Sequence, residues 1–441
     1  MSRLLPARLP GSLFEASGGE WGLVVFAGFK PVAGRREAVW VGSIPTRLRQ
    51  FGRETQPHAA HARFLGMNER GLVDAIALLL ASGVGSRTGK LLIEQFRTAT
   101  AAFAASRDDL LHVGLTREQV ESLRDPALPD RAWRELGAVR AAGAEVVPLG
   151  SDVYPPMLAE TYDPPVVIFG RGQWRDALVD APVVAIVGSR RASTYGRNVA
   201  ERIATDLARR GVTVISGLAR GIDSVAHRGA VDAGGRSVAV MGTGIDAIYP
   251  RENDRLSARL LERGGLVTEF PTSTPPSGQN FPFRNRVISG LSHGVLVVEA
   301  ADRSGSLITA RMAIEQGRDV FAVPGNVTSA TSVGPNLLIR DGACLVRSWA
   351  DVVEELPSPW RDRILEAERE QPAQANLSAV ADVTEGERLV LKHLAADTPR
   401  HIDSLADRTR LDAGSLADAL FTLELKGLAA ALPGGLYIRK L

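Results

Sequence analysis

Residues 183–196 read Val-Val-Ala-Ile-Val-Gly-Ser-Arg-Arg-Ala-Ser-Thr-Tyr-Gly. A short apolar run, mostly β-branched, comes first, and Gly188, a polar loop and a segment of helical length at residues 197–210 follow it. Such a run favours a buried strand, and a glycine after it lets the chain turn closely into the next element. The stretch therefore predicts the first strand, loop and helix of a parallel α/β sheet.

The same alternation of strand and helix continues along the chain. We expect a second helix at residues 222–233 and further strands at residues 212–216, 237–241, 265–268, 294–299 and 319–323. Apolar strands that alternate with helices build a parallel sheet covered on both faces. Residues 133–355 are therefore predicted to form a Rossmann-like, doubly wound α/β domain.

Four further segments flank this domain. Residues 1–65 show no sustained period and stay unassigned. Residues 66–130 are predicted to form a helical domain of the helix-hairpin-helix or SAM type. Its glycine turns at 82–86 and 113–115 either approach a DNA phosphate or are plain capping turns. Residues 356–382 are predicted to be a linker, and residues 383–441 a winged-helix domain, from their order of three helices and a hairpin.

Composition limits the class of protein. The 441 residues are 45% hydrophobic and 23% charged, which is typical of a globular chain. Cys344 is the single cysteine, so an internal disulfide and a site with several thiolates are excluded, in agreement with a reducing cytoplasm. No signal-peptide core or run of about 20 apolar residues is present. We expect a cytoplasmic protein with no membrane contact, no metal and no cofactor.

Positive charge is concentrated in one region, although the net charge is only +2. Residues 186–228 contain eight arginines against three acids. In an open α/β sheet the ligand lies at the carboxyl ends of the strands, where these loops belong. The first loops therefore predict an anion site with Gly188, Ser189, Arg190, Arg191, Gly217, Arg220 and Gly221. The spacing lacks Gly-x-Gly-x-x-Gly, so dinucleotide binding is not predicted. Asp223, suited to an N-cap, and His227 are predicted to make structural hydrogen bonds.

Later loops add aromatic and polar groups to this predicted crevice. Phe281 precedes Arg284, Asn285 and Arg286, and such a mixture stacks bases and binds phosphates in single-stranded nucleic acid. Phe281 and Phe283 are equally compatible with a place in the core. Arg251 follows a third strand, and Ser304 and Gly305 stand at a helix start after a fifth. No metal cluster and no clear acid/base pair is visible.

Several motifs together resemble the DNA-processing protein A (DprA/Smf) family. They occur in family order over about 200 residues: Ile-Val-Gly-Ser-Arg at 186–190, Ser-Gly-Leu-Ala-Arg-Gly-Ile-Asp at 216–223, Tyr-Pro-Arg-Glu-Asn at 249–253, Phe-Pro-Phe-Arg-Asn-Arg at 281–286, Ser-Gly-Ser-Leu-Ile-Thr-Ala at 304–310 and Val-Pro-Gly at 323–325. The resemblance implies a core that binds single-stranded DNA, forms a homodimer and loads RecA in natural transformation (competence). It implies a DNA-binding protein and not an enzyme, with DNA repair as a second setting and duplex DNA and single-strand-binding protein as further partners.

The resemblance also suggests roles for particular residues. Gly188, Ser189 and Arg190 resemble the family's phosphate pocket, and Leu338, Ile339 and Leu345 resemble its dimer edge, although they equally fit an ordinary last strand. The family often carries a lysine between residues 269 and 281, whereas this chain has none there. Residues 384–441 hold eight basic and eight acidic residues, a balance that favours a partner contact over duplex DNA for the winged helix.

Two other classes of protein remain as alternatives. A related Rossmann-like crevice hydrolyses nucleotides, but those enzymes carry Pro-Gly-Gly-x-Gly-Thr where this chain has Val-Pro-Gly-Asn-Val-Thr at 323–328. A scaffold whose arginines form a solvated face would bind DNA weakly or without dependence on salt. The arginines lie at predicted strand ends and not along outer helix faces, which favours DNA binding.

Overall fold

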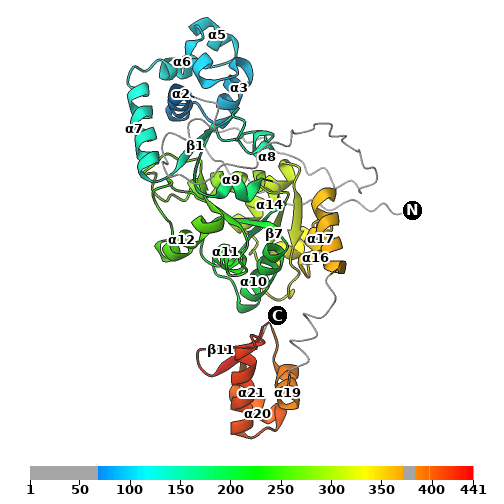
Figure 1. The fold of residues 1–441 in the computed structure, drawn as a ribbon. Coiled ribbons are helices and arrows are strands. Elements are labelled where there is room, and N and C mark those ends of the chain that lie inside the picture. The colour runs from blue at the N-terminus through cyan, green and yellow to red at the C-terminus, as the bar shows by residue number, and fades with distance from the viewer. Residues whose placement is uncertain (1–67, 180, 371–382, 397, 441) are drawn as a thin grey trace, which may run out of the picture. The chain divides into compact units, whose positions relative to one another are not determined.

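The computed structural model describes residues 68–179, 181–370, 383–396 and 398–440. The unassigned extension 1–65 lies outside these residues, as does the end of the predicted linker at 371–382. Among the described residues, no helix has the length and apolar character needed to cross a membrane. The elements are labelled in Figure 1.

The first described segment is helical, as predicted. Ser106 and Thr116 begin two of its helices with capping boxes, in which each hydroxyl and the side chain three residues later satisfy amides reciprocally. Gly83 and Gly114 lie in the two predicted glycine turns with φ of 74° and 103°. The helices are α2 (Glu69–Leu80), α3 (Ser86–Phe96), α4 (Ala99–Ala104), α5 (Arg107–His112), α6 (Arg117–Leu123) and α7 (Leu128–Ala141).

A nine-stranded sheet forms the centre of the molecule. Its order is β1-β2-β6-β5-β4-β3-β7-β8-β9, with parallel pairing from β6 to β9 and antiparallel pairing of β1 with β2 and of β2 with β6. The strands are β1 (Glu145–Pro148), β2 (Val167–Gly172), β3 (Val183–Val187), β4 (Thr213–Ser216), β5 (Ser237–Val240), β6 (Gly265–Thr268), β7 (Gly294–Val297), β8 (Asp319–Ala322) and β9 (Cys344–Leu345). The six predicted strands are all present.

Strand β3 lies where the direction of winding changes. The chain runs outward from β3 through β4 and β5 to β6, and then returns to β7 on the other side of β3. Loops that leave neighbouring strands in opposite directions open a crevice at their carboxyl ends. The topology therefore places a candidate site after β3 and β7.

Helices cover both faces of the sheet, which confirms the doubly wound prediction. Val184 and Ile186 of β3 share a core with α10, α11 and α16, while Val183, Ala185 and Val187 point to the face that α13 and α14 cover. This alternation follows the two-residue period of a strand. The helices are α8 (Pro156–Ala159), α9 (Trp174–Leu178), α10 (Thr194–Arg209), α11 (Ile222–Asp232), η1 (Arg251–Asn253), α12 (Asp254–Arg263), α13 (Asn280–Gly290), α14 (Gly305–Glu315), α15 (Val333–Arg340), α16 (Trp349–Val353) and α17 (Ser358–Glu370).

Helices α15 and α17 of the core differ from their predictions. Leu338 and Ile339 belong to helix α15 and not to a last strand, while Leu345 lies in the two-residue edge strand β9. Helix α17 occupies the first part of the predicted linker, and Ile364 is buried in the same core as α10 and α11. Spacing alone missed α17 because few of its residues are apolar and, among its described side chains, only Ile364 is buried.

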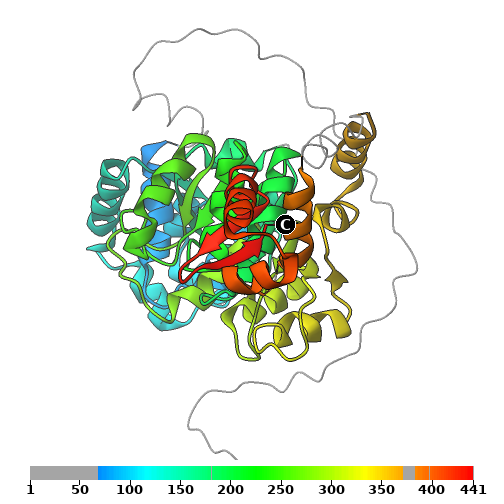
Figure 2. The same cartoon turned by 90° about the horizontal axis from the view of Figure 1, so that it is seen from below.

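The C-terminal segment has the predicted winged-helix order. Helices α19 (Glu385–His393), α20 (Ile402–Thr409) and α21 (Ala413–Leu425) precede a hairpin of β11 (Ala429–Leu432) and β12 (Leu436–Arg439), and β10 (Arg400–His401) pairs with β12. Leu405, Leu420 and Leu423 are buried in a separate core. Figure 2 shows the hairpin (red) against the helices of this segment.

His227 of α11 is buried and makes the structural hydrogen bond expected of it. Its Nδ1 lies 2.8 Å from the Ser237 Oγ, and that hydroxyl donates to the Val214 carbonyl oxygen. Burial lowers the pKa of His227 to about 3, with help from the charges of Arg284 and Arg228. The folded protein therefore holds this imidazole neutral at pH values where an unfolded histidine takes up a proton.

We expect His227 to make stability depend on pH. The unfolded state binds the extra proton between pH about 6.5 and about 3, so the free energy of unfolding falls as pH decreases through this window, by about 1.4 kcal/mol per unit. His227→Gln should flatten the profile in urea denaturation at pH 7, 6 and 5. His112→Gln, at an exposed position, is the control and should keep the wild-type slope. Equal slopes in all three proteins would contradict the prediction.

Candidate functional site

A crevice of about 830 Å³ opens at the point where the winding changes direction. Loops after β3, β4 and β7 and the start of α13 line it. Of the predicted residues, those that line it are Gly188, Ser189, Arg190, Arg191, Phe281, Arg284, Asn285, Ser304 and Gly305. The structure thus brings together residues that are more than one hundred positions apart in the chain.

The loop after β3 depends on two glycines for its path. A Cβ on Gly188 would come within 2.7 Å of the Ile222 side chain and 3.0 Å of the Glu299 carbonyl oxygen. Gly221 begins α11 with φ of 78°, and a Cβ there would meet the Ser189 carbonyl oxygen at 2.2 Å. Gly221, and not Asp223, is therefore the N-cap residue. These glycines let β3, β7 and α11 approach closely enough to form the wall of the crevice.

Arg284 forms the floor of the crevice. Its side chain is buried, with only 3% exposure, and its Nη1 donates to the Gly217 carbonyl oxygen at 2.6 Å and to the Val240 carbonyl oxygen. The guanidinium fills the space beside Gly217, where a Cβ would come within 2.5 Å of it. Gly217 was predicted as a ligand contact, but it accommodates Arg284 instead.

Asp223 is the carboxylate nearest this floor. It accepts hydrogen bonds from the backbone amides of Gly217 at 3.2 Å and Ala219 at 3.4 Å. Burial raises the pKa of Asp223, and the charge of Arg284 opposes that shift. Burial likewise lowers the pKa of Arg284 to about 10, so its guanidinium remains charged at neutral pH. Asp223 thus has the structural role that we predicted.

The aromatic wall carries a second arginine. The Arg190 guanidinium lies over the Phe281 ring, 5.0 Å from its centroid, and the Tyr249 ring packs against Phe281 at 5.8 Å with a tilt of 34°. Phe281 is half-buried at the crevice, and Phe283 is 62% exposed outside its lining. Neither ring belongs to the fully buried core, so the alternative that Phe281 and Phe283 are core residues is wrong. The cation–π contact orients Arg190 over the opening.

The start of α14 closes the opposite side. Ser304 is the N-cap residue, and its hydroxyl accepts from the Ser306 amide and lies 2.8 Å from the Ser306 Oγ. Gly305 follows it in the crevice lining. Arg303 precedes it, is exposed, and also lines the crevice. Helix starts present free amides and a positive dipole end, which favour an anion.

Charge in the crevice is strongly unbalanced. The lining contains four arginines (Arg190, Arg191, Arg284 and Arg303) and one acid, Asp223, whose carboxylate is buried and already bonded to amides. A low-dielectric cleft with one sign of charge concentrates its field on the opening. Arg303 and Tyr249 also line the crevice, although neither was predicted to. Both stand in or beside the motifs that predicted the site, but spacing could not show which side chains face inward.

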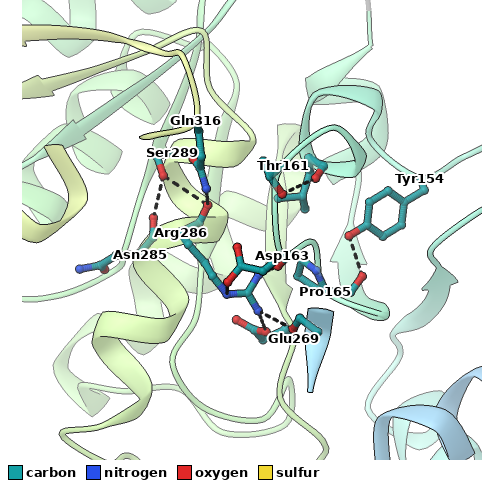
Figure 3. A network of polar contacts seen from close by, with 11 residues as sticks. Tyr154, Thr161, Asp163, Pro165, Glu269, Asn285, Arg286, Ser289 and Gln316 are labelled. Atoms are coloured by element: carbon teal, nitrogen blue, oxygen red, sulfur yellow. Dashed lines mark hydrogen bonds and ion pairs between the residues drawn. The ribbon is translucent and has the colours of Figure 1, made fainter. Parts of the chain in front are cut away.

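Five predicted residues do not line the crevice. Gly217 and Gly221 serve the packing described above. Arg251 is exposed on η1, and Arg220 is ion-paired with Glu252 at 2.8 Å. The fifth, Arg286, is 5% exposed and belongs to a buried network (Figure 3).

The network around Arg286 joins the core to the helical segment. Its guanidinium pairs with Glu269 and with Asp163, and donates to the Ser86 Oγ of α3 at 3.1 Å. Burial raises the pKa of Glu269 to about 7, although the charge of Arg286 opposes this. Arg286 was predicted to flank DNA, but its partners occupy it. The sequence could not show this because Asp163 and Ser86 are distant in the chain.

Fold and crevice together define a Rossmann-like protein with an arginine-lined crevice and a winged-helix segment. Among the residues that the structure describes, no group of histidines, cysteines or acids could hold a metal ion. Residues 145–357 match the family model of DNA recombination-mediator protein A, and residues 370–435 match that of the DprA winged helix domain. The chain belongs to the DNA-processing protein A (DprA/Smf) family.

Individual relatives agree with this assignment. Protein Smf of Escherichia coli is 44% identical over 300 residues, which are 67% of this chain and 77% of that protein. The DNA processing protein DprA of Bacillus subtilis is 40% identical over 260 residues, 59% of this chain and 85% of that protein. The X-ray structure of DNA processing protein A from Streptococcus pneumoniae is similar with a TM-score of 0.56 and 34% identity, over 65% of this chain and 98% of that one.

Gly221 offers a test of the crevice wall. Gly221→Ala should lower the free energy of unfolding by at least about 1–3 kcal/mol, because alanine at this φ is strained and its Cβ overlaps the Ser189 carbonyl oxygen. Gly278→Ala is the matched control, since Gly278 also lines the crevice and nothing lies within 4 Å of its added Cβ. Urea denaturation should find that control within about 0.5 kcal/mol of wild type. Similar losses in both variants would refute the packing role.

Proposed function

We propose that the crevice binds single-stranded DNA and that the protein is a recombination mediator. One observation carries this proposal. Four arginines line the crevice where the winding of the sheet changes direction, and the one acid in the lining, Asp223, already accepts hydrogen bonds from backbone amides. Arginine pairs with phosphate oxygens in any sequence, and an aromatic wall suits unstacked bases. The family description, DNA recombination-mediator protein A, supports the same function.

A single strand fits the crevice better than a duplex does. The lining is a narrow hollow of about 830 Å³ with backbone amides and arginines at its floor and rim. Duplex DNA is stiff, with a persistence length of about 150 base pairs, and it cannot bend into such a hollow. A single strand can turn its phosphates inward and place bases against Tyr249 and Phe281.

Arg303 is proposed to replace the lysine that the family often carries before Phe281. In this chain that segment contributes only Pro276 and Gly278 to the lining, and neither has a charge. Arg303 stands at the start of α14 on the other side of the same crevice. A phosphate between that segment and the start of α14 would therefore be neutralised by Arg303.

The RecA-loading function and the homodimer form part of the same proposal. Leu345 is 41% exposed on the edge strand β9, and Leu338 and Ile339 are half-buried on α15. Exposed apolar groups at a sheet edge favour pairing with a second copy. Two linked crevices would hold one strand more tightly through effective concentration. Natural transformation is the proposed setting, and DNA repair would use the same binding chemistry.

The winged helix is proposed to contact a partner protein and not duplex DNA. Phe421 and Leu425 of α21 are 62% and 72% exposed, and Asp418 on the same helix is exposed as well. A helix that inserts into the major groove needs cationic and amide side chains at these positions. An apolar face with an acid favours a protein surface.

Arg190 tests DNA binding in the crevice. Arg190→Ala should weaken binding of fluorescent poly-dT at least about tenfold, which is about 1.4 kcal/mol, since a charge-assisted phosphate contact is lost. The slope of log affinity against log salt should become shallower by about 0.7. Arg363→Ala, exposed on α17 away from the crevice lining, is the matched control and should bind as wild type does. Equal binding by all three proteins would place DNA elsewhere.

RecA loading needs a separate assay. On single-stranded DNA coated with single-strand-binding protein, the wild-type protein should shorten the lag before labelled RecA assembles, and Arg363→Ala should do the same. Arg190→Ala should restore the lag because it holds DNA poorly. If the wild type leaves the lag unchanged while still binding poly-dT, the protein binds DNA without loading RecA.

A further inference from the structure

The arginine-rich segment 186–228 contains cations that the crevice does not use. Arg190 and Arg191 line the crevice, and Arg220 is ion-paired with Glu252. Arg210 pairs with Glu368 at 2.9 Å and lies over the Trp349 ring. Arg197 of α10 and Arg228 of α11 remain exposed. Within the part of the chain that the structure describes, no carboxylate lies within ion-pair distance of either.

Close packing of α10 and α11 brings these two arginines to one surface. A Cβ on Gly229 would come within 2.7 Å of the Glu201 carbonyl oxygen, so the two helices touch along their length. Arg197 and Arg228 lie on this surface together with Ser193, Thr194 and Asn198. We call this set the α10–α11 face. Figure 1 shows the two helices side by side below the sheet.

Acidic groups do little to neutralise the α10–α11 face. Glu201 is its exposed acid, whereas Asp206 is shared between Arg202 and Arg210 at 3.8 Å. The Arg197 Nε donates to the Ala192 carbonyl oxygen at 3.2 Å, which holds its guanidinium beside the loop. Two arginines and the Thr194 hydroxyl against one exposed acid suit an anion with several charged groups.

One loop separates this face from the crevice. Arg191 lines the crevice, and Ser193, two residues later, belongs to the α10–α11 face. A polyanion that leaves the crevice over Arg191 therefore meets Arg197 and Arg228 next. A flexible single strand can follow this change of direction, whereas a stiff duplex cannot.

We propose that the α10–α11 face is a second phosphate-binding surface, which holds the part of a single DNA strand that leaves the crevice. This proposal rests on single-stranded DNA binding in the crevice. The contacts are to phosphates, so they add affinity in any sequence. A strand too short to leave the crevice gains nothing from them, and a longer strand does.

The test compares two strand lengths. We would measure binding of fluorescent oligothymidylates of about 6 and about 20 nucleotides, one near the lower end of the roughly 4–16 nucleotides that a single-strand-binding OB fold covers and one beyond its upper end. The double variant Arg197→Ala/Arg228→Ala should bind the short strand within about twofold of wild type. It should bind the long strand at least about tenfold more weakly, with a salt slope shallower by about 1.4, the value for two phosphates.

Three further proteins make the outcomes distinct. Arg190→Ala should weaken both lengths, and Arg363→Ala neither. Arg228→Glu tests the face without touching the Arg197 contact to the loop, and it should weaken the long strand alone. If the wild type binds neither strand, DNA binding in the crevice itself fails. If it binds both strands and the α10–α11 variants match it on the long one, or weaken both lengths equally, the second surface is refuted.

Discussion

The buried guanidinium of Arg284 is the contact on which the site depends. It joins the carbonyl oxygens that end β4 and β5 to helix α13, and it faces a carboxylate that the amides after β4 already hold. Removing a buried charge that is bonded in this way leaves its partners unsatisfied, at a cost of about 3–5 kcal/mol. The same group supplies positive potential at the floor of the crevice, so one side chain serves both the packing and the electrostatics of the site.

The glycines around this floor explain why the backbone segments of the site come so close to one another and to Arg284. Gly188, Gly217 and Gly221 each stand where a Cβ would overlap a neighbouring group of the protein. Because these residues have no side chains, β3, β7, α11 and Arg284 can meet, and the arginines at the rim are left facing the crevice. A site built in this way distinguishes charge and shape more than it distinguishes one base from another.

Sequence patterns predicted the strands and the doubly wound class because both depend on local period and order. They also placed Arg190 and Arg191 in the crevice, because a loop that directly follows a buried parallel strand lies at the carboxyl edge of the sheet. They placed Arg284 and Arg286 there as well, and could not separate the one that lines the crevice from the one that does not. Two residues apart on one helix, one arginine faces the crevice floor and the other faces Glu269, Asp163 and Ser86, and only the assembled fold decides which. Helix α17 was missed because its apolar positions are few.

Within about one turn, helix α13 contacts the crevice on one side and the helical segment on the other. Asn285 and Arg284 reach the crevice, and Arg286 reaches Ser86 at the start of α3. Thr272 and Lys90 add two more ties between the core and the helical segment, through Glu135 and the Thr161 carbonyl oxygen. A displacement of the helical segment would therefore be transmitted mechanically to the floor of the crevice. A partner that displaced α3 or α7 could therefore weaken ligand binding in the crevice without contacting the ligand.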